Sequence, residues 1–174
     1  MQSVVDSLVK KAPPRKHRLE INEAILQVIA LAQNEMASKG ISLRTQLAEA
    51  LPATQGDRVQ LQQMILNLLI NAIEAMSEMS EGPRELLIST AKTDSEGVLV
   101  AVRDSGPGLA PESVDRLFES FYTTKPGGLG MGLSICRSII EAHHGRLWAT
   151  ANTPHGAIFQ FTLPPYSSGE KEDR

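Results

Sequence analysis

The amino-acid sequence predicts a single domain that contains both helices and strands. Apolar residues recur at the spacing of amphipathic helices in the stretches 22–38 and 58–77 and in the run after Gly132. Alternating or continuous apolar residues, which are typical of strands, occur at 41–47, 85–91, 98–103, 146–151 and 158–163. With 174 residues, the chain is long enough to form one well-buried core.

The composition is that of an ordinary soluble globular protein, with 41% hydrophobic and 21% charged residues. A net charge of -3 gives no basic surface, so a nucleic-acid partner is not expected. The single cysteine, Cys136, excludes an internal disulfide, fits a reducing cytosol and is expected to be a buried apolar side chain. Because no apolar run reaches the length of a membrane span, we expect a cytoplasmic domain without direct membrane contact, whose longer parent could still be membrane-anchored.

The N-terminal residues 1–17 are interpreted as the remnant of a preceding helix followed by a basic linker. Pro13 and Pro14 cannot continue a helix, and a frayed native N-terminus is the alternative. The domain itself is expected to span 18–164 and to open with a short edge strand at 18–21.

Asn22 is expected to cap the first helix, which runs to about Ser38 and stops at Gly40. The stretch 41–47 then alternates apolar and polar residues, which predicts a half-buried strand. The apolar face of the helix is expected to consist of Ile25, Leu26, Ile29 and Met36.

The helix at 58–77, with Asp57 as its cap, is the most informative element. Its apolar residues lie on nearly every side, which predicts deep burial. A polar stripe interrupts this surface, and its members share one face because they are three or four residues apart: Gln63, Asn67, Asn71 and Glu74. Amides on an apolar helix are costly unless a polar group meets them. The stripe therefore predicts either a ligand site or a face that meets solvent or a neighbouring loop.

The run 98–103 is almost continuously apolar, which indicates a central strand close to 85–91. It ends at Asp104, which is followed by Ser-Gly-Pro-Gly. A carboxylate at this position suits recognition of a hydrogen-bond donor on a ligand, although a plain type I or II turn uses the same residue types. A short helix is expected from Pro111 to Glu119.

A glycine-rich loop precedes the amphipathic run SICRSIIEAHH. Free N–H groups and the helix dipole make such a helix start an anion site, and glycine lets a phosphate approach the backbone closely. The loop therefore predicts phosphate binding, with a flexible surface loop as the alternative. The residues concerned are Lys125, Gly127, Gly128, Gly130 and Gly132.

The chain is expected to close with the strands 146–151 and 158–163, joined by a turn that contains Gly156. The polar residues 165–174 are expected to be disordered.

Three segments of the chain, in this order, resemble the motifs of a known family. NLLINAIEAM from Asn67, RDSGPGL from Arg103 and FESFYTTKPGGLGMGLSI from Phe118 resemble the asparagine, first glycine, phenylalanine and second glycine boxes of sensor histidine kinases. These kinases belong to the ATPase superfamily that includes DNA gyrase and MutL, and the likeness covers 19–164. It implies an α+β fold, the two-layer α/β sandwich called the Bergerat fold. In that fold a mixed sheet of about five strands carries helices on one face, and a flexible lid, here the stretch 122–129 with Lys125, covers ATP.

The resemblance also implies roles for individual residues, with ATP and Mg2+ as cofactors. Asn71 matches the asparagine that binds magnesium, and Asn67 and Glu74 flank it. Asp104 matches the aspartate that accepts a hydrogen bond from the adenine amine. The catalytic residues implied are Asn67, Asn71 and Lys125. The other nucleotide-binding residues implied are Gly106, Gly108, Tyr122, Thr124, Gly128, Leu129, Gly130, Met131, Gly132 and Leu133.

Asn67 distinguishes the subfamilies of this superfamily. Relatives that hydrolyse ATP carry a glutamate there as general base, and an amide cannot take a proton at neutral pH. Hydrolysis is therefore disfavoured, and the γ-phosphoryl group is left for an external acceptor. None of the chain's histidines has the setting of the family's phosphoacceptor, and all are expected to be surface or capping residues: His17, His143, His144 and His155.

We therefore expect the catalytic domain of a sensor histidine kinase, a protein-histidine kinase of two-component signalling. It would bind Mg-ATP and transfer the γ-phosphoryl group to a histidine on a separate dimerisation and phosphoacceptor domain. Its partners would be that domain and, downstream, a response regulator, and the fragment alone is expected to be a monomer. The alternatives are a stand-alone ATPase of the same superfamily and a non-enzymatic regulator that binds ATP.

Overall fold

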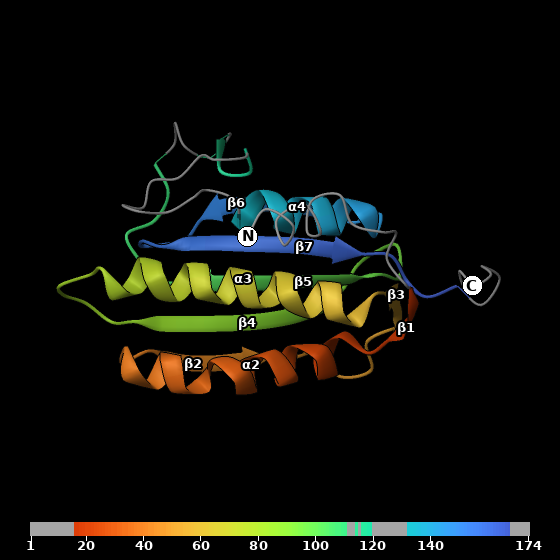
Figure 1. The fold of residues 1–174 in the computed structure, drawn as a ribbon, viewed down its shortest axis with the longest axis horizontal. Helices are drawn as coiled ribbons and strands as arrows, with labels where there is room; N and C mark the ends of the chain where they lie inside the picture. The colour runs from red at the N-terminus through yellow and green to blue at the C-terminus, as the bar shows by residue number, and fades with distance from the viewer. Residues whose placement is uncertain (1–15, 111–113, 115, 120–131, 168–174) are drawn as a thin grey trace, which may run out of the picture.

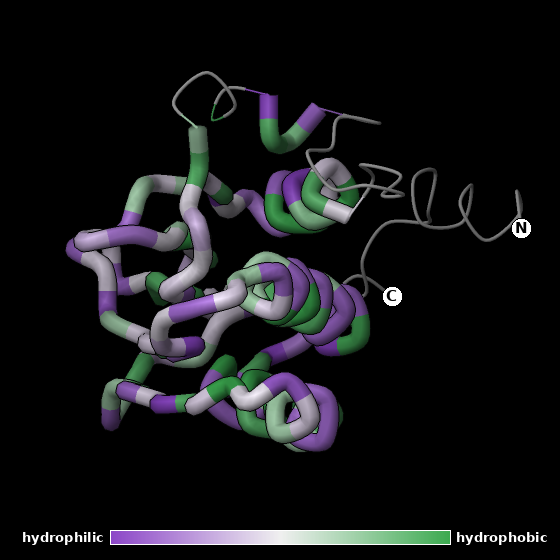
Figure 2. Tube along the Cα trace, turned by 90° about the vertical axis from the view of Figure 1, so that its left-hand side faces the viewer, coloured by the Kyte–Doolittle hydropathy of each residue, from purple (hydrophilic) through white to green (hydrophobic). Residues whose placement is uncertain are grey.

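The computed structural model shows a two-layer protein in which α2, α3 and α4 cover one face of a mixed sheet (Figure 1). It describes residues 16–110, 114, 116–119 and 132–167. Figure 2 shows the helices stacked side by side along one side of the sheet. This arrangement confirms the predicted α+β sandwich.

The main sheet has the strand order β2-β4-β5-β7-β6. β2 pairs with β4 in parallel, and the remaining pairs are antiparallel, so the sheet is mixed as predicted. The predicted central position of β5 is confirmed. The strands of the main sheet are β2 (Ser42–Gln46), β4 (Glu85–Lys92), β5 (Val98–Asp104), β6 (Arg146–Ala151) and β7 (Ala157–Leu163).

A small second sheet closes one end of the domain, where β1 (His17–Leu19) pairs antiparallel with β3 (Thr54–Gly56). Pro165 bridges to Thr54, and the Tyr166 N–H donates to the carbonyl of residue 53 at 2.8 Å. The disorder predicted from residue 165 is therefore wrong for 165 and 166, because the backbone there pairs with the start of β3 through the Tyr166 N–H. Residues 1–15 and 168–174 lie outside the described residues, as do 111–113 and 115 of the helix expected at 111–119.

Helix α2 (Ile21–Ser38) shows that the predicted N-cap, Asn22, is wrong. Glu20 occupies the cap position without a side-chain cap hydrogen bond. The Asn22 side chain instead donates from Nδ2 to Ala48 O at 2.9 Å and accepts from Thr90 Oγ1 at 3.0 Å. These partners are far away in the sequence, so the asparagine links helix to sheet where the local pattern suggested a cap.

The apolar face predicted for α2 is correct except for Leu26, which is 52% exposed, whereas Ile25, Ile29 and Met36 are buried. Gly40 follows the last turn of the helix, as predicted. The half-buried strand predicted at 41–47 is confirmed as the edge strand β2: Ile41, Leu43 and Leu47 pack against the core, and the polar residues between them are exposed.

Helix α3 (Arg58–Ser77) lies across the middle of the sheet (Figure 1). Asp57 caps it as predicted, since its Oδ1 accepts the Gln60 N–H at 3.2 Å. The guanidinium of Arg84 donates to Met79 O at 2.8 Å, just beyond the C-terminal end of α3. The core therefore forms around a helix held at both ends. Its buried residues are Leu61, Met64, Ile65, Leu68, Leu69, Ala72, Ile73 and Met76.

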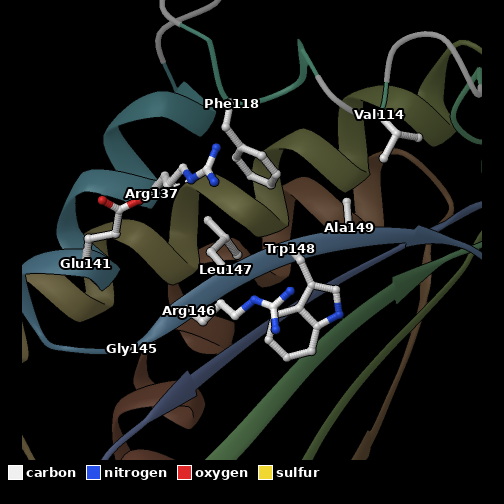
Figure 3. A pocket seen from close by; sticks show the side chains of 9 residues that line it. All are labelled: Val114, Phe118, Arg137, Glu141, Gly145, Arg146, Leu147, Trp148 and Ala149. Carbon is white, nitrogen blue, oxygen red and sulfur yellow. Dashed lines mark ion pairs between the residues drawn. The ribbon is translucent and has the colours of Figure 1, made fainter.

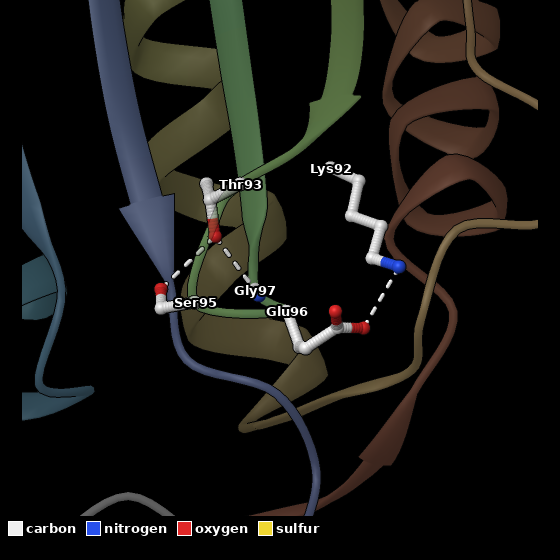
Figure 4. A network of polar contacts seen from close by, with 5 residues as sticks. All are labelled: Lys92, Thr93, Ser95, Glu96 and Gly97. Carbon is white, nitrogen blue, oxygen red and sulfur yellow. Dashed lines mark hydrogen bonds and ion pairs between the residues drawn. The ribbon is translucent and has the colours of Figure 1, made fainter.

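The turn between β4 and β5 fixes the register of the two central strands (Figure 4). Thr93 Oγ1 accepts the Gly97 N–H at 2.9 Å, and the Thr93 N–H donates to Gly97 O at 3.0 Å. Lys92 and Glu96 add an exposed ion pair at 2.8 Å, which contributes little to stability. This turn pairs Lys92 with Val98 and places Asp104 at the opposite end of β5.

Helix α4 (Gly132–Ala142) confirms the helix predicted after the glycine loop. It ends in a reversal in which the Gly145 N–H donates to Ile140 O at 2.9 Å and the His144 N–H donates to Glu141 O at 3.0 Å. His144 therefore sits at the position that glycine usually occupies, with φ of 61°. None of the described helices is both long and apolar enough to cross a lipid bilayer.

Replacing His144 with glycine should stabilise the domain, because glycine adopts positive φ without the steric cost of a Cβ. We expect His144→Gly to raise the free energy of unfolding by about 1 kcal/mol, or the melting temperature by roughly 2–4 °C. The matched control is His144→Ala, which removes the imidazole but keeps the Cβ and should give no gain. Equal stabilisation by both variants in thermal unfolding would contradict this explanation.

Candidate functional site

Helices α3 and α4 pack against each other in opposite directions, and this brings the start of α4 to the polar stripe. At one end, the Asp57 N–H, just before α3, donates to His143 Nε2, just after α4, at 2.9 Å. Farther along, the Cys136 thiol contacts Met64 O at 3.6 Å. Gly132 lies one helical turn before Cys136, at the start of α4. Because the two helices run in opposite directions, Gly132 faces the part of α3 that continues from Met64 toward Asn71.

The polar stripe lies at the boundary between core and solvent. Gln63, Asn67 and Asn71 are half-buried, and Glu74 is exposed. Asn67 hydrogen-bonds the Cys136 thiol, and Asn71 and Glu74 each have an interaction partner. The two interpretations of the stripe, ligand site and contact with a neighbouring element, are therefore compatible, because Asn67 contacts α4 and the three amide residues are only half-buried.

Cys136 is confirmed as a buried apolar side chain, with 0% of its surface exposed. Burial raises the pKa of its thiol to about 12, and the hydrogen bond from Asn67 only partly offsets that effect. The thiol therefore stays neutral and acts neither as a nucleophile nor as a metal ligand at neutral pH.

Asp104 is a buried carboxylate, 3% exposed, at the end of β5. Its Oδ1 accepts the Gly106 N–H at 2.9 Å and the Ala157 N–H at 3.2 Å. The turn that the sequence suggested is present, and the carboxylate organises it. A carboxylate offers about four acceptor positions, so a group held by two N–H donors can still accept a hydrogen from a ligand.

The loop after Asp104 packs against the C-terminal end of α3. A Cβ added to Gly106 would lie 3.5 Å from both Ala75 Cβ and Met76 Cγ. Along α3, Asn71 lies between this contact and the contact of Asn67 with α4. The helix rises about 12 Å over this interval, which suits an elongated ligand. The arrangement places a carboxylate at one end, amides in the middle and a helix start at the other end.

The predicted residues of the glycine loop and lid fall mainly outside the described part of the chain. Gly132 and Leu133 form the first turn of α4, where Gly132 is exposed and Leu133 is half-buried. No atom lies within 4 Å of the position that a Cβ on Gly132 would take. The predicted residues that lie outside the described residues are Tyr122, Thr124, Lys125, Gly128, Leu129, Gly130 and Met131.

Of the two roles expected for His143, surface or capping, the structure shows capping: the residue is 1% exposed and its ring bonds to the last turn of α4 and to the cap residue of α3. Its Nδ1 donates to Ile139 O at 2.8 Å, because a carbonyl can only accept, and its Nε2 accepts the Asp57 N–H. The ring is therefore neutral and joins the end of α4 to the cap residue of α3. Nothing in the local sequence signals a partner 86 residues away.

A separate pocket of about 320 Å³ lies between α4, β6 and the segment around Phe118 (Figure 3). Arg137 pairs with Glu141 at 3.1 Å and lies 5.3 Å from the centre of the Phe118 ring. The guanidinium of Arg146 lies 5.2 Å from the Trp148 ring centre. None of the residues that line this pocket belongs to α3 or to the loop after β5, so it is distinct from the elongated site.

Comparison with known proteins identifies a family. Residues 56–167 match the family described as Histidine kinase-, DNA gyrase B-, and HSP90-like ATPase. The chain is 36% identical over 162 residues to the sensor histidine kinase TmoS of Ectopseudomonas mendocina. This match covers 92% of the chain and 17% of TmoS, so the chain spans less than a fifth of the length of that relative.

Solved structures of histidine kinases share the fold. The catalytic domain of histidine kinase ThkA superposes with a TM-score of 0.76 and 32% identity, over 86% of this chain and 97% of that domain. ThkA in complex with the response regulator TrrA gives 0.77 and 27%, over 97% of this chain and 49% of that chain. Full-length ShkA in complex with AMPPNP gives 0.82 and 26%, over 95% of this chain and 36% of that chain.

The neutral state of His143 predicts how stability depends on pH. Burial holds the pKa of this ring below its ordinary value of about 6.5, and the charge of Lys16 and the neighbouring His144 lower it further. The contact with Ile139 O and the charge of Asp57 partly oppose these effects. Since the unfolded chain takes up this proton more readily, the free energy of unfolding should fall as the pH drops below about 6.5.

His143→Gln tests this explanation in denaturant unfolding at pH 7.5 and 5.5. An amide can replace part of the hydrogen bonding but does not titrate, so the variant should be less stable at pH 7.5, by about 1–3 kcal/mol. It should also lose less stability than the wild type on going to pH 5.5. The same pH-dependent loss in both proteins would show that other groups cause it.

Proposed function

The chain belongs to the histidine kinase-, DNA gyrase B- and HSP90-like ATPase family, as a histidine kinase catalytic domain, and we propose that it binds ATP with Mg2+ and transfers the γ-phosphoryl group to a histidine on another domain. The observation that carries this proposal is the position of Asn71. It lies on α3 between the buried carboxylate of Asp104 and the start of α4, where the base, metal and phosphates of one nucleotide would need their respective partners.

Each end of the site suits a different part of the nucleotide. The Asp104 carboxylate would accept a hydrogen bond from the adenine amine, with the loop containing Gly106 and Gly108 beneath the base. The N–H groups at the start of α4, at Gly132 and Leu133, would donate to phosphate oxygens. The remaining lid and glycine-loop residues are proposed to close over the phosphates: Tyr122, Thr124, Lys125, Gly128, Leu129, Gly130 and Met131.

Asn71 is the proposed metal ligand. Magnesium prefers oxygen ligands and keeps several waters, and the side chain of the half-buried Asn71 offers an amide oxygen as such a ligand. Asn71 would hold the ion, which would supply positive charge that neutralises part of the charge on the phosphates. The neutral, buried Cys136 nearby offers no competing thiolate.

Asn67 favours transfer to an external acceptor over hydrolysis. It lies one turn before Asn71, and its amide cannot act as a general base. His143 cannot be the acceptor, because it is buried and both ring nitrogens are hydrogen-bonded. We propose that a histidine of the parent protein's dimerisation domain attacks the γ-phosphorus through a ring nitrogen, forming a P–N bond as the bond to ADP breaks.

The proposed partners are the phosphoacceptor domain of the parent protein and a response regulator. We propose that the phosphorylated histidine passes its group to a response regulator, and the complex of the similar kinase ThkA with TrrA supports this direction. The domain would act in the cytoplasm and be a monomer when separated from the dimerisation helices. A net charge of -3 offers no basic surface for nucleic acid.

The proposed metal site is tested with Asn71→Ala in a calorimetric titration of AMPPNP, with and without Mg2+. We expect the variant to lose at least about tenfold in magnesium-dependent affinity, because the ion loses its protein ligand. Gln63→Ala is the matched control, since it removes an amide from the same stripe two turns away. Unchanged binding by Asn71→Ala, with normal thermal unfolding, would overturn the assignment.

A phosphate-release assay separates the kinase from a stand-alone ATPase. The proposal predicts slow release of phosphate from ATP by the wild-type chain, and acid-labile labelling of a phosphoacceptor domain added from a similar sensor kinase. Sustained phosphate release that depends on Asn71 would favour the ATPase. Retention of ATP without transfer to any histidine domain would favour the non-enzymatic regulator.

A further inference from the structure

The turn between β6 and β7 contacts Asp104 at several atoms. We propose that Asn152, the first residue of this turn, is a positioning residue for Asp104 and thereby determines the preference for adenine over other bases. The inference rests on the proposed function of Asp104 and adds the part of the chain that would hold this carboxylate in place.

The first contact is made on the β7 side of Asp104, whose other side is paired with Leu86 of β4. The ladder between β5 and β7 ends at the pair Arg103 and Ile158. Just beyond it, the Asn152 side chain donates from Nδ2 to Asp104 O at 2.9 Å, across 48 residues of sequence. The amide of Asn152 therefore supplies a hydrogen bond that the neighbouring strand does not.

Asn152 is itself fixed within the turn. Its N–H donates to Gly156 O at 3.0 Å, and its Oδ1 accepts the Thr153 N–H at 2.9 Å. With Oδ1 engaged as an acceptor, only the NH2 group can face the Asp104 carbonyl, so the orientation of the amide is determined. An aspartate at this position would keep the bond to Thr153 but lose the donor to Asp104.

The far side of the turn holds the carboxylate of Asp104. The Ala157 N–H donates to its Oδ1 at 3.2 Å. Gly156 makes this approach possible, because its φ is +111° and a Cβ there would lie 2.0 Å from Asp104 O. A Cβ on Gly108 would likewise lie 3.1 Å from Gly156 O, so the turn and the loop after β5 are in direct contact.

His155 adds a contact to the loop itself. Its Nδ1 lies 3.0 Å from Gly106 O, and the ring nitrogen is the donor because a carbonyl only accepts. The turn therefore holds the carbonyl of Asp104, its carboxylate and the loop after it. Because Asp104 is held at both its backbone and its side chain, its carboxylate has little freedom to reorient.

The position of the Asp104 carboxylate would determine how strongly the site prefers adenine over other bases. Hydrogen bonds weaken steeply when their geometry is poor, so a displaced carboxylate would lose the adenine amine. A site arranged to accept a hydrogen discriminates strongly against a ligand that lacks the donor. Hypoxanthine carries a carbonyl oxygen where adenine carries the amine, which makes ITP the probe that reports on this contact.

The test compares magnesium-loaded ATP and ITP binding to the wild type, Asn152→Asp and Thr153→Asp by calorimetry. The control places the same added charge in the same turn but keeps the Asn152 amide. We expect the wild type and Thr153→Asp to prefer ATP by about tenfold or more, as for a hydrogen bond to a charged group. Asn152→Asp should lose most of this preference. General destabilisation would weaken both nucleotides alike and leave the ratio unchanged.

A second readout uses the nucleotide-free protein. Amide hydrogen exchange should be faster in Asn152→Asp at Gly106 and Ala157, whose N–H groups bind Asp104 Oδ1, than in the wild type. If Asn152→Asp does not fold, His155→Ala, which alters an exposed side chain of the same turn, should still reduce the ATP preference and increase exchange at Gly106.

The outcomes separate this inference from the proposed function. A wild-type ATP preference that Asn152→Asp retains, with unchanged exchange at both amides, would overturn the role of Asn152. A wild type that binds ATP and ITP equally would overturn the role of Asp104 in reading the base. In that case the amide exchange still decides whether Asn152 positions the carboxylate.

Discussion

The site depends on the antiparallel packing of α4 against α3. The His143 ring joins the end of α4 to the residue that caps α3, and the Cys136 thiol meets the α3 backbone farther along. The Cys136 contact is buried and the His143 contact is partly buried, so sliding one helix along the other would leave polar groups without partners away from solvent, which is costly. This constraint directs the start of α4 toward Asn71. The phosphate end of the proposed site is therefore set by a hydrogen bond made at the opposite end of the helix pair.

The end of the proposed site that would bind adenine depends on a single side chain, Asp104. Asp104 lies at the end of the central strand, and its carboxylate organises the turn that follows it. The same group would read the adenine amine, so structure and recognition rely on one side chain. The β6–β7 turn, which closes the sheet farther along the chain, reaches back to hold it. Recognition of the base would thus depend on a segment that contributes no proposed nucleotide contact of its own.

Much of this fold could be predicted from the sequence because its helices and strands have clear apolar periodicity. The limits of α3 and the central position of β5 follow from the burial pattern and from the capping role of Asp57. Residues whose roles depend on distant partners could not be predicted in this way. Asn22 looks like a cap but bonds to the sheet, and His143 looks like a helix-end residue but is buried against α3. The resemblance to histidine kinases predicts nucleotide and metal roles for Asp104 and Asn71, whereas Asn152 carries no local signal because its partner is 48 residues away.

A crystal structure of the domain with AMPPNP and Mg2+ would show directly whether the nucleotide occupies the proposed site. We expect the adenine amine to donate to the Asp104 carboxylate, the side-chain oxygen of Asn71 to bind the ion, and the phosphates to lie at the start of α4. A nucleotide bound elsewhere, for example between Arg137 and Trp148 in the separate pocket, with Asp104 and Asn71 making no contact to it, would contradict the account.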